Sequence, residues 1–199
     1  MRFPKVLVPL LVLAALVACS KPPQAEVESA KAALDAAVKN PDVGAYAPDA
    51  LKAAQDRLAK LQAELDAQAT KGALSRKYDA ARNMALEAKA AAEDLATRAA
   101  TAKEQTKAEA MTLLNDLRLT VPEVEKGLAQ ARRVGGIRLD FKALAASLAQ
   151  AKTEVAAAET AYNNGDYATA KATAAAVKGS LTHGQQVVAD AVAAAKVSK

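Results

Sequence analysis

Apolar side chains return every three or four positions along most of this chain, which is the period of one face of an α-helix. The pattern is plainest in three segments. Its members are Leu51, Ala54, Leu58, Leu61 and Leu65 in the first segment, Tyr78, Ala81, Ala85, Ala88, Ala92, Leu95, Ala99 and Ala102 in the second, and Tyr167, Ala170, Ala174, Val177, Leu181, Val188, Ala191 and Ala195 in the third. Gaps that alternate between three and four residues predict helices that pack side by side as in a coiled coil.

Residues that start and stop helices divide the chain into six predicted helices. Their expected ranges are about 25–39, 48–71, 75–119, 120–134, 140–162 and 167–195. Asn40-Pro41 and Gly72 are typical of helix ends, so residues 41–47 are expected to form a loop. Ser75 and Asp140 are the expected amino-terminal caps of the third and fifth helices.

The fourth helix is expected to begin at Thr120. Thr120 and Glu123 have the spacing of a capping box, and Pro122 suits a first helical turn. Gly135-Gly136 is expected to end this helix, and "NNGD" at residues 163–166 predicts a turn before the last one.

Composition supports an all-α fold. The 199 residues include 54 alanines but only 8 Gly, 7 Pro and no Trp, and alanine has the highest helix propensity. Alanine buries little area, so the core should be thin and the helices closely packed. We therefore expect an elongated antiparallel helical bundle or coiled coil.

Two halves of the chain look alike. The motif "EVE" occurs at Glu26 and again at Glu123, and "YDAAR" at Tyr78 corresponds to "YATAK" at Tyr167. This similarity predicts two similar three-helix units, which cover residues 25–119 and 120–199.

The first 18 residues differ from the rest. "MRFPK" carries two positive charges, and residues 6–18 are apolar apart from Pro9. Because a membrane-spanning helix needs about 20 apolar residues, this stretch predicts a signal peptide instead. Residues 19–24 then form a short tether, since paired prolines do not lie deep in a helix.

The end of the leader resembles the bacterial lipobox, in the residues Leu16, Val17, Ala18 and Cys19, the only cysteine. The resemblance implies that the Cys19 thiol takes a diacylglyceryl group and that cleavage falls between Ala18 and Cys19. A thiolate is the required nucleophile, and two or more acyl chains anchor a protein durably. In Gram-negative lipoproteins, the absence of aspartate after the cysteine, here Ser20, implies sorting to the outer membrane, facing the periplasm.

Charge does not indicate a nucleic-acid partner. The formal charge is +5, and about +3 without the leader; acidic and basic residues alternate along the helices, and aromatic residues make up 3%. This pattern is typical of solvated helix faces.

Residues 44–65, "GAYAPDALKAAQDRLAKLQAEL", resemble a helical domain of unknown function in alanine-rich bacterial envelope lipoproteins, some of which also carry an OmpA-like domain. The shared features are "YAP", here Tyr46-Ala47-Pro48, and a return helix that opens "Y-x-x-A", here Tyr78 to Ala81. The second half is less similar, with Leu139-Asp140-Phe141 in place of "YAP". No catalytic residues are assigned to that family, so the resemblance implies no chemistry.

Catalytic and metal-binding motifs are missing from the sequence. His183 is the only histidine and is expected to be an exposed polar residue, and neither GxxxxGK[ST] nor GxGxxG occurs. The acidic residues suit exposed helix faces. Tyr46, Tyr78, Tyr162 and Tyr167 lie at predicted turns, where each ring is expected to cover the end of an alanine-lined stripe. We predict neither an enzyme nor a cofactor or metal site.

The prediction for function is a non-catalytic, lipid-anchored envelope protein. Its helices would act as a periplasmic spacer or as a scaffold for other envelope proteins, with self-association through coiled-coil stripes left open. The alternative is a solenoid-like binding module for a peptide or a cell-wall glycan, since "GDYATA" resembles the turn of tetratricopeptide repeats. Those repeats have a fixed period of 34 residues, which this chain lacks.

Overall fold

The computed structural model describes residues 21–134 and 137–197, and these residues confirm the all-α prediction. The helices are α1 (Gln24–Val38), α2 (Pro41–Tyr46), α3 (Pro48–Ala69), the 3₁₀ turn η1 (Ala73–Ser75), α4 (Asp79–Glu93), α5 (Leu95–Ala131), α6 (Phe141–Asn163) and α7 (Tyr167–Val197). No strand occurs in this part of the chain.

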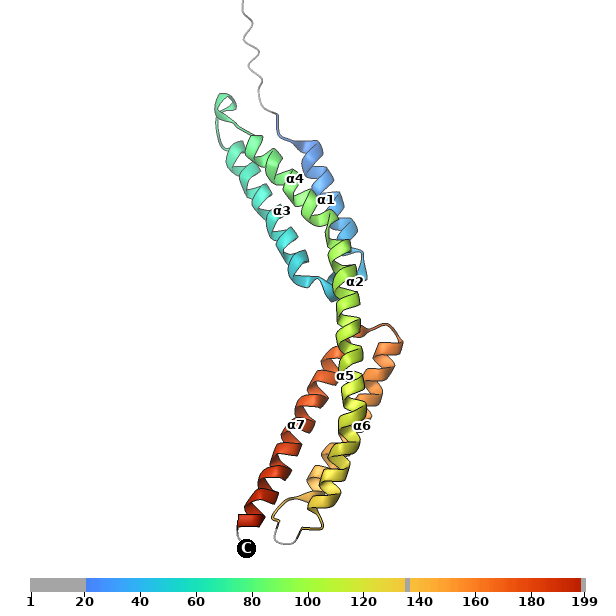
Figure 1. Ribbon diagram of the computed structural model, residues 1–199. Coiled ribbons are helices and arrows are strands. Elements are labelled where there is room, and N and C mark those ends of the chain that lie inside the picture. The colour runs from blue at the N-terminus through green and yellow to red at the C-terminus, as the bar shows by residue number, and fades with distance from the viewer. Residues whose placement is uncertain (1–20, 135–136, 198–199) are drawn as a thin grey trace, which may run out of the picture.

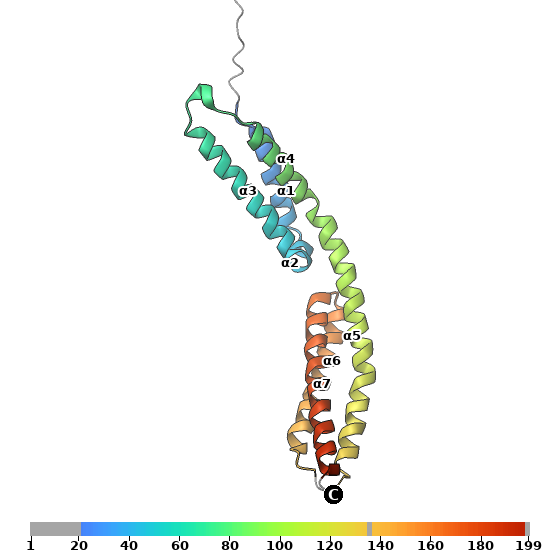
Figure 2. The ribbon, with the colours of Figure 1, turned by 60° about the vertical axis from the view of Figure 1, so that its left-hand side comes forward.

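The molecule is an elongated rod made of two groups of helices. Figure 1 shows α1, α3 and α4 at one end, α6 and α7 at the other, and α5 running from the middle to the far end. The view in Figure 2 shows the same separation. The 37 residues of α5 extend about 55 Å at about 1.5 Å per residue. One helix therefore connects the two groups.

The N-terminal unit, which we define as α1, α3 and α4, is built around α4. Helix α4 packs against both α1 and α3, whereas α1 and α3 contact each other little. Alanines dominate its interior, and the fully buried residues Ala81 and Ala85 face Val27 and Leu61. Small side chains let the helix axes approach closely, which is how an alanine-rich stripe forms a core.

The C-terminal unit, which we define as residues 110–131 of α5 together with α6 and α7, has a larger core. All three of its helix pairs are in contact. One continuous cluster fills the interior, and its members are Leu114, Leu117, Leu128, Leu148, Ala151, Ala158, Ala174, Val177 and Leu181.

The predicted helix break at residues 119–120 is wrong. Helix α5 is continuous through Pro122, and Thr120 and Glu123 form no capping box there. Proline removes one backbone donor and costs about 3 kcal/mol in a helix interior. Val121 and Val124 pack against the C-terminal core, and this burial offsets that cost. The boundary predicted between the two units therefore lies inside one helix, and the duplication of the units stays a prediction.

The third predicted helix has different bounds. It begins at Asp79 instead of Ser75, which lies in η1, and Ser75 caps nothing. Only Asp94 separates α4 from α5; its N–H still donates to the Ala90 carbonyl, and its backbone stays in the right-handed helical region. Helices α4 and α5 therefore follow one another with little interruption.

The segment 41–47 is also different from the prediction, because residues 41–46 form the short helix α2. Asn40 caps it by accepting a hydrogen bond from the backbone N–H of Asp42 at 3.0 Å, and Pro41 occupies the first helical position. Asparagine followed by proline is a helix start as well as a helix end.

Two predicted turns are confirmed. Asp140 caps α6 by accepting from the N–H groups of Lys142 and Ala143 at 3.0 and 2.9 Å. Gly165 has a φ of +82° in the turn before α7, a conformation that strains residues with a Cβ.

Candidate functional site

The predicted lipidation site lies outside the described residues. This applies to Leu16, Val17, Ala18 and Cys19, and to the cleavage site between Ala18 and Cys19. Among the helices that are described, none combines the length and the apolar character needed to cross a bilayer. Lipidation at Cys19 therefore stays a prediction.

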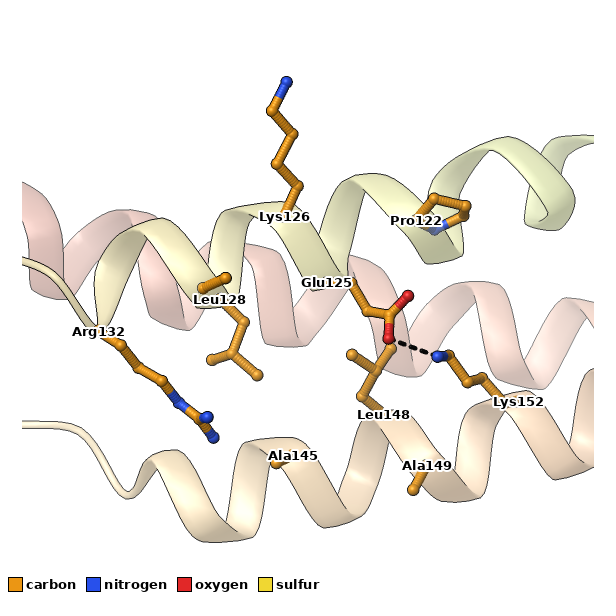
Figure 3. A pocket seen from close by; sticks show the side chains of 10 residues that line it. Pro122, Glu125, Lys126, Leu128, Arg132, Ala145, Leu148, Ala149 and Lys152 are labelled. Atoms are coloured by element: carbon orange, nitrogen blue, oxygen red, sulfur yellow. Dashed lines mark hydrogen bonds and ion pairs between the residues drawn. The ribbon is translucent and has the colours of Figure 1, made fainter.

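A groove of about 580 Å³ runs between the C-terminal half of α5 and the start of α6. Leu128 and Leu148 form its apolar floor. Figure 3 shows Glu125 of α5 and Lys152 of α6 reaching toward each other across it, where they form an ion pair, while Lys126 points away. The two helices are thus joined by a bridge over an apolar surface.

The ionisable side chains that line this groove are mostly basic. Its ionisable residues are one carboxylate, Glu125, which the Lys152 ammonium neutralises, and the cations Lys126 and Arg132. The remaining lining is Ala, Leu and Pro. In the described part of the chain, no group of three His, Cys, Asp or Glu side chains is placed to hold a metal ion.

A second cluster lies between the two units, where α2 and the α6–α7 turn come together on α5, and we call it the waist. Its members are Asp42, Tyr46, Lys103, Lys107, Tyr162, Gly165 and Tyr167. The Tyr46 hydroxyl donates to the Gly165 carbonyl at 3.4 Å. This bond joins α2 directly to the α6–α7 turn, 119 positions away in sequence.

Two lysines of α5 lie over the tyrosine rings of the waist. The Lys103 Nζ atom is 5.7 Å from the ring centre of Tyr46, and the Lys107 Nζ atom is 5.6 Å from that of Tyr167. The rings of Tyr162 and Tyr167 are 5.1 Å apart and tilted by 58°. Cations within about 6 Å of a ring centre are attracted by its quadrupole, so the waist holds α2 and the α6–α7 turn against α5.

Charge at the waist is paired. The Asp42 carboxylate accepts from Lys103 at 2.9 and 3.0 Å, and this hydrogen bond raises the pKa of Lys103 above its usual value. Lys171 of α7 lowers the pKa of Glu109 of α5 by the same kind of contact. The arrangement is a structural junction in which each charge has an opposite partner.

The tyrosines predicted at turns separate into two groups. Tyr78 is 5% exposed and packs in the N-terminal unit against Leu61 and Ala81, whereas Tyr46, Tyr162 and Tyr167 meet at the waist. Lys103 and Lys107 are not among the residues predicted from the sequence to be functional. Their spacing of four residues on one helix face was the available signal. His183 is exposed, as predicted.

Comparisons with known proteins give no identification: no family model matches the chain, no curated protein is similar to it, and no solved structure resembles it. The resemblance of residues 44–65 to envelope lipoproteins therefore stays a prediction.

Proposed function

We propose that this chain is a non-catalytic, lipid-anchored protein of a bacterial cell envelope, which acts as a helical spacer or interaction scaffold in the periplasm. Cys19 is its anchor, and the outer membrane is its site. Other envelope proteins, and a second copy of the chain, are its candidate partners.

The observation that carries the proposal is helix α5, whose 37 residues run from just after α4 of the N-terminal unit to the far end of the C-terminal unit. A continuous helix transmits position along its length, which is what a spacer needs. Two contacts stiffen the junction, the Asp42–Lys103 ion pair and the Tyr46–Gly165 hydrogen bond. The lipobox-like residues 16–19 add a means of attachment at the end where α1 begins.

Exposed apolar side chains on the rod support a scaffold role. Leu119 of α5 is 71% exposed and Leu74 of η1 is 85% exposed. Scattered exposed apolar residues are common on protein surfaces, so these two are positions at which to look for contacts. Photo-crosslinkers placed there in cells test for partners and for a crosslinked dimer.

The anchor is tested by the variant Cys19→Ala. The parent chain should incorporate labelled palmitate, lose residues 1–18 and fractionate with membranes. The variant should do none of these, because it lacks the thiolate that accepts the lipid. Mass spectrometry of the amino-terminal peptide measures both cleavage and acylation, and an unmodified parent peptide that retains residues 1–18 would refute the proposed anchor.

A matched variant tests the membrane assignment separately. Ser20→Asp keeps Cys19 and should keep lipidation, yet it should move the protein to the inner-membrane fraction. An unchanged distribution with normal acylation would contradict the outer-membrane part of the proposal and leave the anchor intact.

The groove between α5 and α6 favours a second candidate function, a binding module for a peptide or a cell-wall glycan. Its apolar floor and its volume of about 580 Å³ fall within the usual size range of ligand pockets. Thermal shifts with muropeptides distinguish the two functions. A shift that is lost in Ala149→Gln, at the wall of the groove, would favour the binding module.

A further inference from the structure

The net positive charge of the rod comes from one segment. Residues 132–142 contain four basic residues, Arg132, Arg133, Arg138 and Lys142, and one acidic residue, Asp140. From residue 21 onward, the rest of the chain contains 21 basic and 21 acidic residues, which balance. We call the four basic residues the basic tip.

The basic tip lies at the end of the rod that is opposite to the start of α1. Figures 1 and 2 show the end of α5 and the start of α6 at one end of the rod and the start of α1 at the other. All four basic side chains are exposed.

The nearby carboxylates are already engaged. Asp140 accepts two backbone N–H groups as the cap of α6, and Glu125 pairs with Lys152. Within residues 21–134 and 137–197, no ion pair joins Arg133, Arg138 or Lys142 to a carboxylate. These three cations are available for an external anion.

Apolar side chains alternate with the cations of the basic tip. Val134, Ile137, Leu139 and Phe141 are all half-buried. Phe141 packs against the C-terminal core. The Arg132 guanidinium lies over the Phe141 ring, 5.7 Å from the ring centre. Ile137 and Leu139 are not among the described residues that pack on that core. They leave apolar surface between the charges.

We propose that the basic tip binds the surface of an anionic lipid bilayer. Clusters of Lys and Arg are attracted to anionic headgroups, and adjacent apolar side chains enter the headgroup boundary. A dissolved polyanion would engage the cations alone, whereas Ile137 and Leu139 suit an interface that is apolar below its charged layer.

Only one part of this inference rests on the proposed function, namely that the opposite end of the rod is anchored through Cys19. A chain that is lipidated at Cys19 and held at its basic tip would link two membrane surfaces. The attraction of the tip itself does not depend on the lipid, so the two proposals can fail independently.

The test is vesicle capture. The full chain, made by cell-free synthesis so that its thiol stays free, is coupled through Cys19 to maleimide lipid in phosphatidylcholine vesicles. Fluorescent acceptor vesicles of phosphatidylcholine, with or without phosphatidylglycerol, are then added. Acceptors with phosphatidylglycerol should be captured, and capture should weaken with added salt because screening shortens the range of the attraction. Equal capture of both acceptors would overturn the proposal.

Two charge-matched variants locate the binding surface. Arg133→Gln, Arg138→Gln and Lys142→Gln together should weaken capture roughly 100-fold, at about fivefold for each cation. The control Lys31→Gln, Lys39→Gln and Lys60→Gln removes the same charge from exposed positions in the other half and should capture as the parent does. An equal loss in both variants would show an effect of net charge and refute a site at the tip. Circular dichroism verifies that both remain helical.

A further pair of measurements separates a bilayer from a soluble polyanion. Ile137→Ser with Leu139→Ser should weaken capture while leaving the charge unchanged. If this variant captures normally and dextran sulfate competes as well for it as for the parent, the partner is a polyanion and the lipid assignment is wrong.

Discussion

Each unit of the rod packs three helices together, but the side chains in the two interiors differ. The interior of the N-terminal unit is mainly alanine and is divided into two clusters, one around Ala54 and Ala92, which continues onto α2 and the start of α5, and one around Leu61 and Ala85. The C-terminal unit has one continuous cluster that is rich in leucine. A leucine buries several times the apolar area of an alanine, so the C-terminal unit gains more hydrophobic stabilisation from each buried position.

Among the described residues, more ion pairs link α5 to α6 or α7 than link the helices of the N-terminal unit to one another. Four of them join α5 to α6 or α7, namely Arg118–Glu159, Lys152–Glu125, Lys171–Glu109 and Lys178–Asp116. In the N-terminal unit, Arg82–Glu26 joins α4 to α1. Exposed pairs stabilise by about 0–1 kcal/mol each, so they set helix register more than stability. From this comparison we expect that enlarging a buried alanine destabilises the N-terminal unit, and that truncating a buried leucine destabilises the C-terminal unit.

The largest expected effect is on the leucine core. Leu117 is fully buried, and Leu117→Ala should lower the free energy of unfolding of the C-terminal unit by about 2–5 kcal/mol, from lost burial and the remaining cavity. Hydrogen exchange should show faster exchange in α6 and α7, with α1 and α3 unchanged. The control Leu119→Ala lies two residues away and is 71% exposed; it should have almost no effect. Equal loss of protection in α1 would mean that α5 couples both units into one cooperative body.

Enlarging a buried side chain should destabilise the N-terminal unit. Ala85 is fully buried against Val27 and Leu61, so Ala85→Leu should destabilise the N-terminal unit by about 1–3 kcal/mol by forcing α4 away from its neighbours. Ala90→Leu, at an exposed position of the same helix, is the control for helix propensity. Urea unfolding followed by a probe in α1 measures both. If Ala85→Leu is neutral, the alanine interior is loosely packed and the contrast between the units is wrong.

A smaller difference concerns how matching helices begin. Asp140 caps α6 with two hydrogen bonds, whereas α3 begins at Pro48 without a side-chain cap. Asp140→Ala should therefore cost about 1 kcal/mol of the C-terminal unit's stability. Asp49→Ala, in the first turn of α3, removes only a favourable interaction with the helix dipole and should cost about 0.5 kcal/mol. Thermal unfolding of each variant compares them, and equal losses would show that the cap hydrogen bonds contribute nothing beyond charge.

The fold class and most helix faces could be predicted because alanine content and period-3.6 patterns act locally. Buried Ala170, Ala174, Val177 and Leu181 follow the predicted stripe of α7. The errors came from local signals that tertiary packing overrode. Pro122 was interpreted as a helix start, yet the burial of its neighbours Val121 and Val124 keeps α5 continuous.

The candidate site was harder to predict because it depends on which helices meet. Tyr46 and Tyr167 were recognised as turn residues, but nothing local indicates that α2 and the α6–α7 turn lie on the same part of α5. The basic tip was missed because apolar residues and glycines interrupt its cations; a running charge count over residues 132–142 would have found it.

The smallest expected effect is a difference between the two halves of the rod in how their stability depends on pH. In the C-terminal unit the Lys171 contact lowers the pKa of Glu109, and a hydrogen bond with Thr169 lowers that of Asp166. A lowered folded pKa gives stability that is present above the unfolded value and is lost as the pH falls through the folded value. In the other half, hydrogen bonds from Lys52 to Asp56 and from Lys103 to Asp42 raise the pKa of each lysine. That stability is present below the usual lysine value and is lost as the pH rises through the raised one.

Hydrogen exchange, corrected for the intrinsic pH dependence of the rate, should therefore show α7 losing protection first in acid, below a pH of about 4. Contacts of α2 and α3 should weaken only in strong alkali. Glu109→Gln should make α7 less sensitive to acid, because the glutamine does not titrate, while Glu104→Gln on the same helix should leave that sensitivity unchanged. Identical acid profiles for the parent and Glu109→Gln would show that the Glu109–Lys171 pair adds nothing measurable at this exposed position, and that the two units differ in their cores alone.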